Sequence, residues 1–331
     1  MASPLDSPRH HACLNTVHPF TANAADSVTS LGELRLIAAI RRWLGPANPP
    51  SPRGIGDDCA VLPPSRHPQL VTVDPVVYGE HFDNSIPPRA VAAKLLKRNL
   101  SDIAAMGGHP RAAVIALALA PDVSMRWLET FYRGLAAAAR TYGVPIVGGD
   151  ITRQKSGIAA TLTLIGEARG PRALTRHGAK PGDWIYVTGT LGGSILGHHH
   201  RFTPRLAEGA WLAARPEVRS LMDLSDGLAK DLPALTPAGA TPSLDSASIP
   251  LSAASRTLAK RDGIPALTHA LTDGEDFELI FTVAVRADHA ALEAAWRKRF
   301  KTRLTNIGRF TRTLETGALT LSAFHGYEHL R

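Results

Sequence analysis

Acidic residues next to glycine or serine recur at the ends of apolar segments along this chain, and this pattern constrains its fold more than any other feature. The two clearest segments are GIGDDCAVL at 54–62 and LMDLSDGLAKDL at 221–232, and further carboxylates stand at Asp74, Asp102 and Asp150. Carboxylates that gather in one place repel one another unless a cation neutralises them. Oxygen ligands suit Mg²⁺, which usually also holds substrate phosphates. The first hypothesis is therefore an enzyme that uses a magnesium nucleotide.

Composition sets the broad class of the protein. A length of 331 residues allows two domains, and 44% hydrophobic with 20% charged residues is typical of a globular protein. No apolar run is long enough to span a membrane. Two cysteines, Cys13 and Cys59, make neither a disulfide framework nor a zinc site, so we expect a cytoplasmic protein.

The net charge of +8 does not indicate a nucleic-acid-binding protein. Lys and Arg are dispersed along the chain, no basic block is interleaved with aromatic residues, and aromatic residues make up only 6%. We expect instead a basic surface that attracts anionic substrates.

Helical and strand-like patterns alternate, which predicts an α/β protein. Residues 1–28 have no apolar period and are predicted to be a disordered tail. The basic, Gly- and Pro-rich segment 169–183 predicts a junction between an N-terminal domain, 29–168, and a C-terminal domain, 169–331. Helices are expected at 31–44, 88–107, 124–142, 204–214 and 287–300, and strands at 69–77, 111–120, 144–150, 158–168, 277–285, 303–311 and 317–323.

The helix at 88–107 gives the strongest local argument for a site. At 3.6 residues per turn, its apolar arc predicts that Lys94, Lys97 and Ser101 lie on the opposite side, whereas Asn99 and Asp102 lie within or beside the arc. A carboxylate that faces the core is costly unless it is paired or bound to a metal. We favour metal binding for Asp102, with a structural salt bridge to an arginine as the alternative.

Each remaining acidic segment also has an ordinary structural interpretation. Ser225 or Asp226 would cap the following helix, VGGD at 147–150 would form a hairpin turn, and GED at 274–276 would be a solvated loop. Their joint occurrence favours a shared site. The run His198–His200 is predicted to be a surface loop, and Cys59 a small core residue.

The common nucleotide-binding motifs are absent. The chain has no P-loop and no kinase motif set, and GIGDDC lacks the third glycine of a dinucleotide-binding fingerprint. A phosphotransferase with this sequence would use another scaffold.

The motifs, in their order, resemble those of the thiamine-monophosphate kinase family over about residues 31–331. They are GIGDDCAVL, VTVDPVVYGEHF, NLSDIAAMGG, VGGDITR, RALTRHGAKPGDWIYVTGTLG, LMDLSDGL and DGEDFELIFTV. The GDD, NLSD and SDGL motifs are similar to those of a wider ATP-binding superfamily that includes aminoimidazole ribonucleotide synthetase and selenophosphate synthetase. The RALTR–GAKPGDWIYVTG segment and the GEHF turn resemble the thiamine kinase specifically.

The resemblance implies two α/β domains and a homodimer in which strands of both N-terminal domains form a central barrel. It implies ATP-dependent phosphorylation of thiamine monophosphate to thiamine diphosphate, with ATP and several Mg²⁺ ions between the domains. The metal ligands that it implies are Asp58, Thr72, Asp74, Asp102, Asp150, Asp223 and Asp226, of which Asp58, Asp102 and Asp226 would also be catalytic. The nucleotide contacts that it implies are Gly149, Asp150, Arg176 and Ser225, and the contacts to the thiamine moiety are His81, Glu275 and Tyr327.

The chain departs from the family at a few positions. It has Thr72-Val73-Asp74-Pro75 where the family usually has Ser-Thr-Asp-Thr, so Val73 removes a hydroxyl expected beside the metals. Asp273-Gly274 replaces a more usual Gly-Gly pair. Two alternatives stay open: another ATP-dependent synthetase of the superfamily, and a degenerate nucleotide-binding protein. Selenophosphate synthetase is disfavoured because Cys13 lies in the polar tail rather than in a Gly-rich loop.

Overall fold

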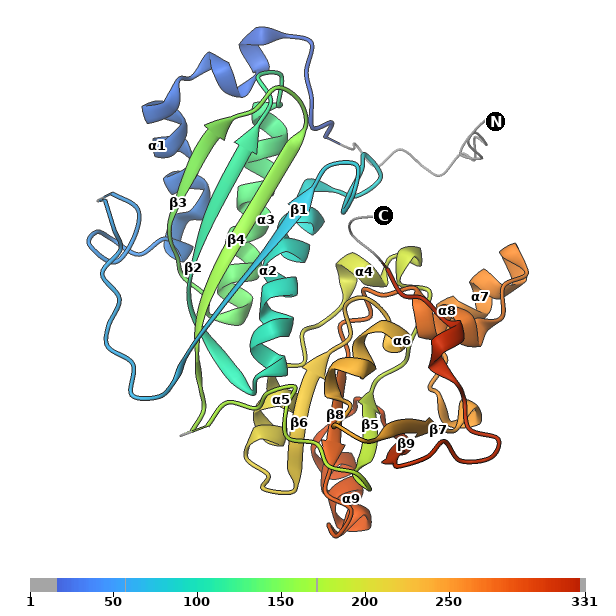
Figure 1. Ribbon diagram of the computed structural model, residues 1–331. Helices are drawn as coiled ribbons and strands as arrows, with labels where there is room; N and C mark the ends of the chain where they lie inside the picture. The colour runs from blue at the N-terminus through green and yellow to red at the C-terminus, as the bar shows by residue number, and fades with distance from the viewer. Residues whose placement is uncertain (1–16, 57, 171, 328–331) are drawn as a thin grey trace.

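Two β-sheets with flanking helices make up the computed structural model, which describes residues 17–56, 58–170 and 172–327 (Figure 1). The first sheet has the strand order β1-β4-β2-β3, and the second has the order β6-β8-β5-β9-β7. This is the mixed α/β class that the alternating pattern predicts.

The first sheet consists of β1 (Gln69–Val77), β2 (Gly108–Leu119), β3 (Ile146–Arg153) and β4 (Ile158–Ala168). Strand β4 pairs antiparallel with both β1 and β2. Strands β2 and β3 pair in parallel, and the crossover helix α3 (Met125–Tyr142) connects them. Strand β1 lies at the edge of the sheet, where Pro75 is tolerated because its missing N–H faces no partner strand.

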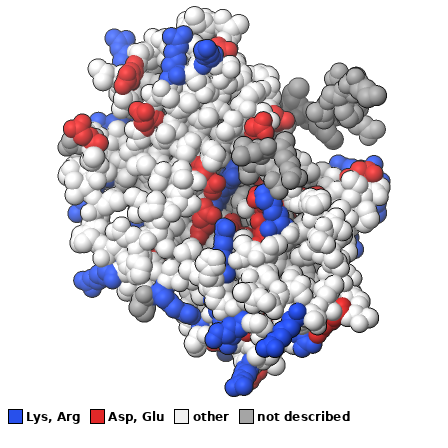
Figure 2. Space-filling view, in the orientation of Figure 1, with Lys and Arg blue, Asp and Glu red and all other residues white. Residues whose placement is uncertain are grey.

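Within the described part of the chain, helices cover one face of this sheet and leave the other uncovered. Helix α1 (Glu33–Leu44), α2 (Pro88–Ala105) and α3 lie on that face, and strand alternation points Leu70 and Val76 towards them. On the opposite face of β1, Val71 is 68% exposed and Val73 is 57% exposed. Figure 2 shows that the surface over these strands carries few charged side chains. The sheet therefore presents one uncovered, largely uncharged face.

The second sheet is antiparallel throughout and carries shorter elements. Its strands are β5 (Trp184–Thr188), β6 (Val218–Asp223), β7 (Thr241–Leu244), β8 (Leu279–Val283) and β9 (Leu304–Thr311). Its helices are α4 (His198–Arg201), α5 (Leu206–Ala213), α6 (Leu228–Asp231), α7 (Ala253–Asp262), α8 (Ala266–Thr272) and α9 (His289–Arg299).

Helix α2 lies between the two sheets, and this corrects one prediction. Lys94, Lys97 and Ser101 were expected on an outer face, but they are 0%, 8% and 1% exposed. They are buried because the side of α2 that faces away from the first sheet packs against α4, α5 and β6. A single-helix projection cannot predict this, since it does not show a second layer.

Most other predicted elements are present, with a few differences in the C-terminal half. The strand expected at 317–323 is instead a short 3₁₀ helix, Leu321–Ala323, beside an isolated bridge between Leu244 and Leu319. Strand β7 and helices α7 and α8 were not anticipated. Helix α1 lies where the sequence predicts a helix, with Leu36 buried and Leu34 82% exposed.

The last part of the predicted tail makes tertiary contacts. Val28 is buried, its N–H donates to the carbonyl of Val123, and Ser27 forms a bridge with Ser124. The ring of Phe20 packs edge-on against Tyr78. The expectation of disorder therefore does not hold for this segment, and residues 1–16 lie outside the described residues. In the described part of the chain, no helix has the length and apolarity that crossing a membrane requires.

Candidate active site

A cavity of about 350 Å³ opens where the first sheet, α2 and the second sheet meet. Figure 2 shows acidic and basic side chains gathered around a hollow near the middle of this face. Its walls come from both halves of the chain and consist of Asp74, Glu80, His81, Arg98, Asp102, Ser194, Ile195, Asp223, Ser225, Asp226, Asp273, Glu275, Phe277 and Tyr327.

Strand β1 and helix α2 bring Asp74 and Asp102 to the same wall. Thr72 and Asp74 alternate with Val73, so both point towards α2, and the Thr72 hydroxyl donates to Asp102. Burial, followed by repulsion from Asp74, raises the pKa of Asp102 to about 6. Burial also raises the pKa of Asp74, although the Arg98 guanidinium, whose Nη2 lies 3.4 Å from Asp74 Oδ1, lowers it. The predicted salt-bridge alternative thus concerns Asp74 rather than Asp102.

The end of β6 supplies Asp223 to the same cavity. Asp223 is only 4% exposed and accepts a 2.6 Å hydrogen bond from Ser101 Oγ on α2. Burial, and then the charge of Asp102, raises the pKa of Asp223 to about 7. Arg176 is exposed but near enough for its charge to lower that pKa. Three carboxylates from three elements thus share one space, with Arg98 and Arg176 as nearby positive charges.

In the SDGL turn after β6, the backbone N–H groups bind a side chain of the following helix, and the side chains of the turn do not cap that helix. The backbone N–H groups of Ser225 and Asp226 both donate to Asp231 Oδ2 at 3.0 Å. The N-cap residue of α6 is Gly227, so the predicted cap by Ser225 or Asp226 is wrong. The turn instead leaves the Asp226 side chain available to the cavity, where it forms an ion pair with Lys230 at 2.9 Å.

The C-terminal segment docks on this turn and brings in Tyr327. The Tyr327 N–H donates to the carbonyl of Asp226 at 3.0 Å. A Cβ on Gly326 would lie 2.4 Å from that same carbonyl oxygen, so only glycine permits this approach. Tyr327 therefore reaches the cavity wall although it lies about a hundred residues from Asp226 in the sequence.

His81 and Glu275 complete the far wall, and a residue that the sequence analysis missed connects them. Lys94 Nζ lies 2.7 Å from Glu275 Oε1 and donates to the carbonyl of His81 at 3.0 Å. His199 Nδ1 is 3.1 Å from the same nitrogen. His199 is buried in α4, so the prediction that His198–His200 form a surface loop is wrong.

Asp58, Gly149 and Asp150 lie at a different cavity, of about 490 Å³, beside α1 and β3. The register of the first sheet follows one row across its four strands, which runs Asp74, Leu162, Ile115 and Gly149. Three strand spacings separate the ends of this row by about 14 Å. Within one chain, Asp58 and Asp150 are therefore not brought together with Asp74, Asp102, Asp223 and Asp226.

The structure corrects three further sequence predictions. Val73 points to the uncovered face of the sheet, so a hydroxyl at this position would not lie beside Thr72 and Asp74. Cys59 is exposed rather than part of a core. VGGD at 147–150 lies in strand β3 and is not a hairpin turn.

The donor set of the central cavity fits Mg²⁺. Among residues 17–56, 58–170 and 172–327, no three His, Cys, Asp or Glu side chains already converge as a preformed metal-binding group. Mg²⁺ does not need one, because it commonly uses one or two carboxylates together with substrate phosphates and water. The raised pKa values of Asp74, Asp102 and Asp223 indicate that burial and mutual repulsion outweigh the opposing charges of Arg98 and Arg176. Asp74, Asp102, Asp223 and Asp226, which line the cavity, could hold such an ion.

Comparison with known proteins identifies the family. Residues 56–168 match the family of AIR synthase related proteins, N-terminal domain. Thiamine-monophosphate kinase of Escherichia coli (strain K12) is 39% identical over 308 residues, which cover 83% of this chain and 91% of that protein. A crystal structure of thiamine-monophosphate kinase from Stenotrophomonas maltophilia K279a aligns with a TM-score of 0.71 and 33% identity, over 86% of this chain and 95% of the other.

A second solved structure, AaThiL complexed with AMPPCP and TMP, aligns with a TM-score of 0.67 and 28% identity, over 91% of this chain and 98% of the other. The agreement in sequence extends over both sheets and covers most of each relative. It also agrees with the resemblance that the motifs indicate. The chain belongs to the thiamine-monophosphate kinase family.

Proposed function

We propose that this protein transfers the γ-phosphate of ATP to thiamine monophosphate and thereby forms thiamine diphosphate. The observation that carries the proposal is the central cavity, where Asp74, Asp102, Asp223 and Asp226 come from both halves of the chain and face one space. Such a cluster suits two crowded phosphate groups with their metal ions. Relatives named thiamine-monophosphate kinase, and a similar structure that binds AMPPCP and TMP, support the choice of substrates.

The chemistry agrees with the side chains around the cavity. A phosphate oxygen of thiamine monophosphate is already anionic, so it can form a bond to the γ-phosphorus of ATP without a general base. The bond from that phosphorus to the β-phosphate oxygen breaks, and ADP leaves. The task left to the protein is to align the two phosphates and to offset their charge. Mg²⁺ would supply that charge, and Arg98 and Arg176 lie near enough to add to it.

The roles of the residues are part of the proposal. We assign metal binding to Thr72, Asp74, Asp102, Asp223 and Asp226, with Asp58 and Asp150 as further ligands. We assign nucleotide contacts to Gly149, Asp150, Arg176 and Ser225. We assign contacts to the thiamine moiety to His81, Glu275 and Tyr327, because they share a wall with the aromatic ring of Phe277 and could enclose a cationic heteroaromatic ring.

A homodimer would explain why Asp58 and Asp150 lie apart from the other ligands. Strands β1 and β3 are the two outer strands of the first sheet, and the face of that sheet away from α2 is uncovered. We propose that β1 of one copy pairs with β3 of a second, so that both sheets close into one barrel. This pairing would bring the edge with Gly149 and Asp150 of a second copy to the β1 edge that carries Asp74.

The remaining assignments follow the sequence analysis. We propose that the two sheets are the cores of two domains, 29–168 and 169–331, and that the protein works in the cytoplasm without nucleic acid or a membrane as partner. The single free cysteine among the described residues, Cys59, agrees with a reducing compartment.

A coupled assay of ADP release tests the proposed function. With ATP and Mg²⁺ present, addition of thiamine monophosphate should start ADP release, whereas thiamine alone or aminoimidazole ribonucleotide precursors should not. ADP release that ignores thiamine monophosphate would favour another synthetase of the superfamily. A protein that binds ATP without any turnover would favour the degenerate alternative.

A further inference from the structure

A buried lysine on α2 contacts two of the residues proposed to meet the substrate. Lys94 is 0% exposed, and its ammonium nitrogen lies within hydrogen-bond distance of three groups. These are the carboxylate of Glu275 at 2.7 Å, the carbonyl of His81 at 3.0 Å and His199 Nδ1 at 3.1 Å. No other lysine in the described residues is as deeply buried. Because Lys94 lies on α2, its side-chain nitrogen can contact both halves of the chain.

The three contacts fit a protonated Lys94 amine. An ammonium has three donors, and a carboxylate, a carbonyl and a neutral imidazole nitrogen each accept one. Burial and the charge of Lys94 lower the pKa of His199 to about 4, so its ring is neutral near pH 7 and Nδ1 accepts. The proton then sits on Nε2, which lies 3.2 Å from His200 Nδ1. Each of the three donors of the Lys94 ammonium thus has an acceptor.

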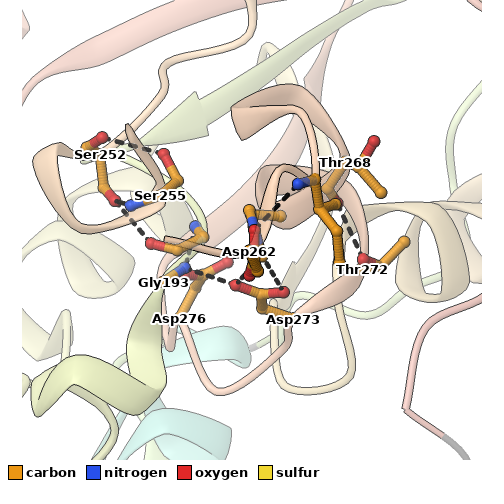
Figure 3. A network of polar contacts seen from close by, with 11 residues as sticks. Gly193, Ser252, Ser255, Asp262, Thr268, Thr272, Asp273 and Asp276 are labelled. Atoms are coloured by element: carbon orange, nitrogen blue, oxygen red, sulfur yellow. Dashed lines mark hydrogen bonds and ion pairs between the residues drawn. The ribbon is translucent and has the colours of Figure 1, made fainter. Parts of the chain in front are cut away.

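Glu275 needs such support because its backbone is strained. Glu275 and Phe277 have φ values of 52° and 50°, a left-handed conformation that is costly for residues other than glycine. On one side of this segment, Asp273 accepts a hydrogen bond from the N–H of Gly193 at 2.7 Å (Figure 3). Asp276 accepts one from the N–H of Gly192 at 2.9 Å. On the other side, Lys94 holds the Glu275 side chain at the cavity wall.

We propose that Lys94 is a positioning residue that fixes the Glu275 carboxylate and the His81 backbone for the cationic ring of the acceptor substrate. The inference rests on the proposed function, because it assumes that the acceptor is an organic cation that carries a phosphate. Lys94 itself does not line the cavity; it acts through Glu275, whose side chain is 31% exposed there. The run His198–His200 gains a role in turn, since His199 orients the ammonium.

Lys97 provides a matched control. It lies one turn further along α2, is 8% exposed and also contacts the second half of the chain, through the carbonyls of His200 and Phe202 at 2.9 and 2.7 Å. Neither His200 nor Phe202 lines the cavity. If buried lysines on α2 only hold the two halves together, Lys94→Met and Lys97→Met should have the same effect on catalysis.

The test compares the KM for thiamine monophosphate, the KM for ATP and kcat in Lys94→Met, Lys97→Met, Glu275→Gln and the double variant Lys94→Met/Glu275→Gln. We expect Lys94→Met to raise the KM for thiamine monophosphate roughly tenfold or more, which is the usual cost of a lost hydrogen bond to a charged group, with the KM for ATP within about twofold. Lys97→Met should leave both constants near wild type. The double variant should be no worse than Glu275→Gln, because Lys94 acts through that carboxylate. Should Lys94→Met not fold, His199→Phe removes one acceptor of the ammonium and should shift the same constant in the same direction.

Some outcomes would overturn the inference. These are equal rises of both KM values, equal effects of the Lys94 and Lys97 changes, or additive effects in the double variant. Calorimetric titration of wild type with thiamine monophosphate separates this inference from the proposed function. Binding without turnover refutes the kinase proposal alone, and the Lys94 variants are then compared by Kd. A wild type that binds neither thiamine monophosphate nor thiamine overturns the positioning role as well.

Discussion

Replacement of Asp223 by asparagine should stabilise the metal-free protein, and the gain should grow with pH. Asp223 is 4% exposed, and burial together with Asp102 raises its pKa from 3.8 to about 7. Its charged form is therefore unfavourable in the folded state. Asparagine keeps the shape and an oxygen that can accept from Ser101, but it carries no charge.

The sign and the size follow from proton binding. Below pH 3.8 Asp223 is protonated in both the folded and the unfolded state, and it does not lower the free energy of unfolding. Between pH 3.8 and about 7 the unfolded chain releases the proton and the folded chain keeps it, so the free energy of unfolding falls as pH rises. Above about 7 the full penalty is present. At about 1.4 kcal/mol per pH unit, the advantage of Asp223→Asn over wild type should widen by ~2–3 kcal/mol between pH 5 and pH 8.

Urea unfolding in EDTA at both pH values, followed by tryptophan fluorescence, measures this difference. Asp245→Asn is the matched control, because Asp245 is exposed and hydrogen bonds from Ser248 and Ala247 lower its pKa. Its replacement should give no gain that widens with pH. An advantage of Asp223→Asn that stays constant or shrinks as pH rises would refute the view that an unneutralised carboxylate cluster strains the empty site.

Three other predictions concern separate parts of the structure. EDTA should abolish activity, and Asp226→Asn should lower kcat by about a hundredfold, as expected for a group that offsets charge in the transition state; full activity in EDTA would argue against the metal site. Tyr327→Ala should raise the KM for thiamine monophosphate and leave that for ATP near wild type, since the backbone N–H of Tyr327, which the change keeps, holds the C-terminal segment on Asp226; an equal rise of both constants would mean that the ring only supports the fold. Deletion of residues 1–28 should lower the melting temperature by several degrees, because it removes buried Val28 and its hydrogen bond to Val123, whereas deletion of 1–16 serves as the control; equal melting temperatures would show that these contacts contribute little.

The sequence predicts the elements that have a clear period and misses those whose environment comes from elsewhere in the chain. Strand β1 and helices α1 and α3 appear within a few residues of the expected bounds, because apolar periodicity and breakers define them locally. The sequence does not show that both sides of α2 are buried, because α4, α5 and β6, which cover its polar side, come from elsewhere in the chain. Helices α7 and α8 have only 10 and 7 residues, which is too short for an apolar period to stand out in the sequence.

The residues of the site likewise include some that the sequence predicts and some that only the structure shows. Acidic motifs predict Asp74, Asp102, Asp223 and Asp226, since carboxylates at the ends of apolar segments stand out in a sequence, and the structure gathers these four around one cavity. Lys94 and His199 gave no comparable signal, because a lysine on a helix and a histidine in a run have common surface roles. Only the packing of α2 against α4 shows that they meet at Glu275.

Identification of the product tests the central claim most directly. Purified protein is incubated with ATP, Mg²⁺ and thiamine monophosphate, and the mixture is followed by ³¹P NMR. We expect the thiamine monophosphate signal to be replaced by the two coupled signals of thiamine diphosphate, in one-to-one proportion with ADP, and Asp226→Asn to slow both changes equally. ADP that accumulates with inorganic phosphate while thiamine monophosphate stays unchanged would contradict it.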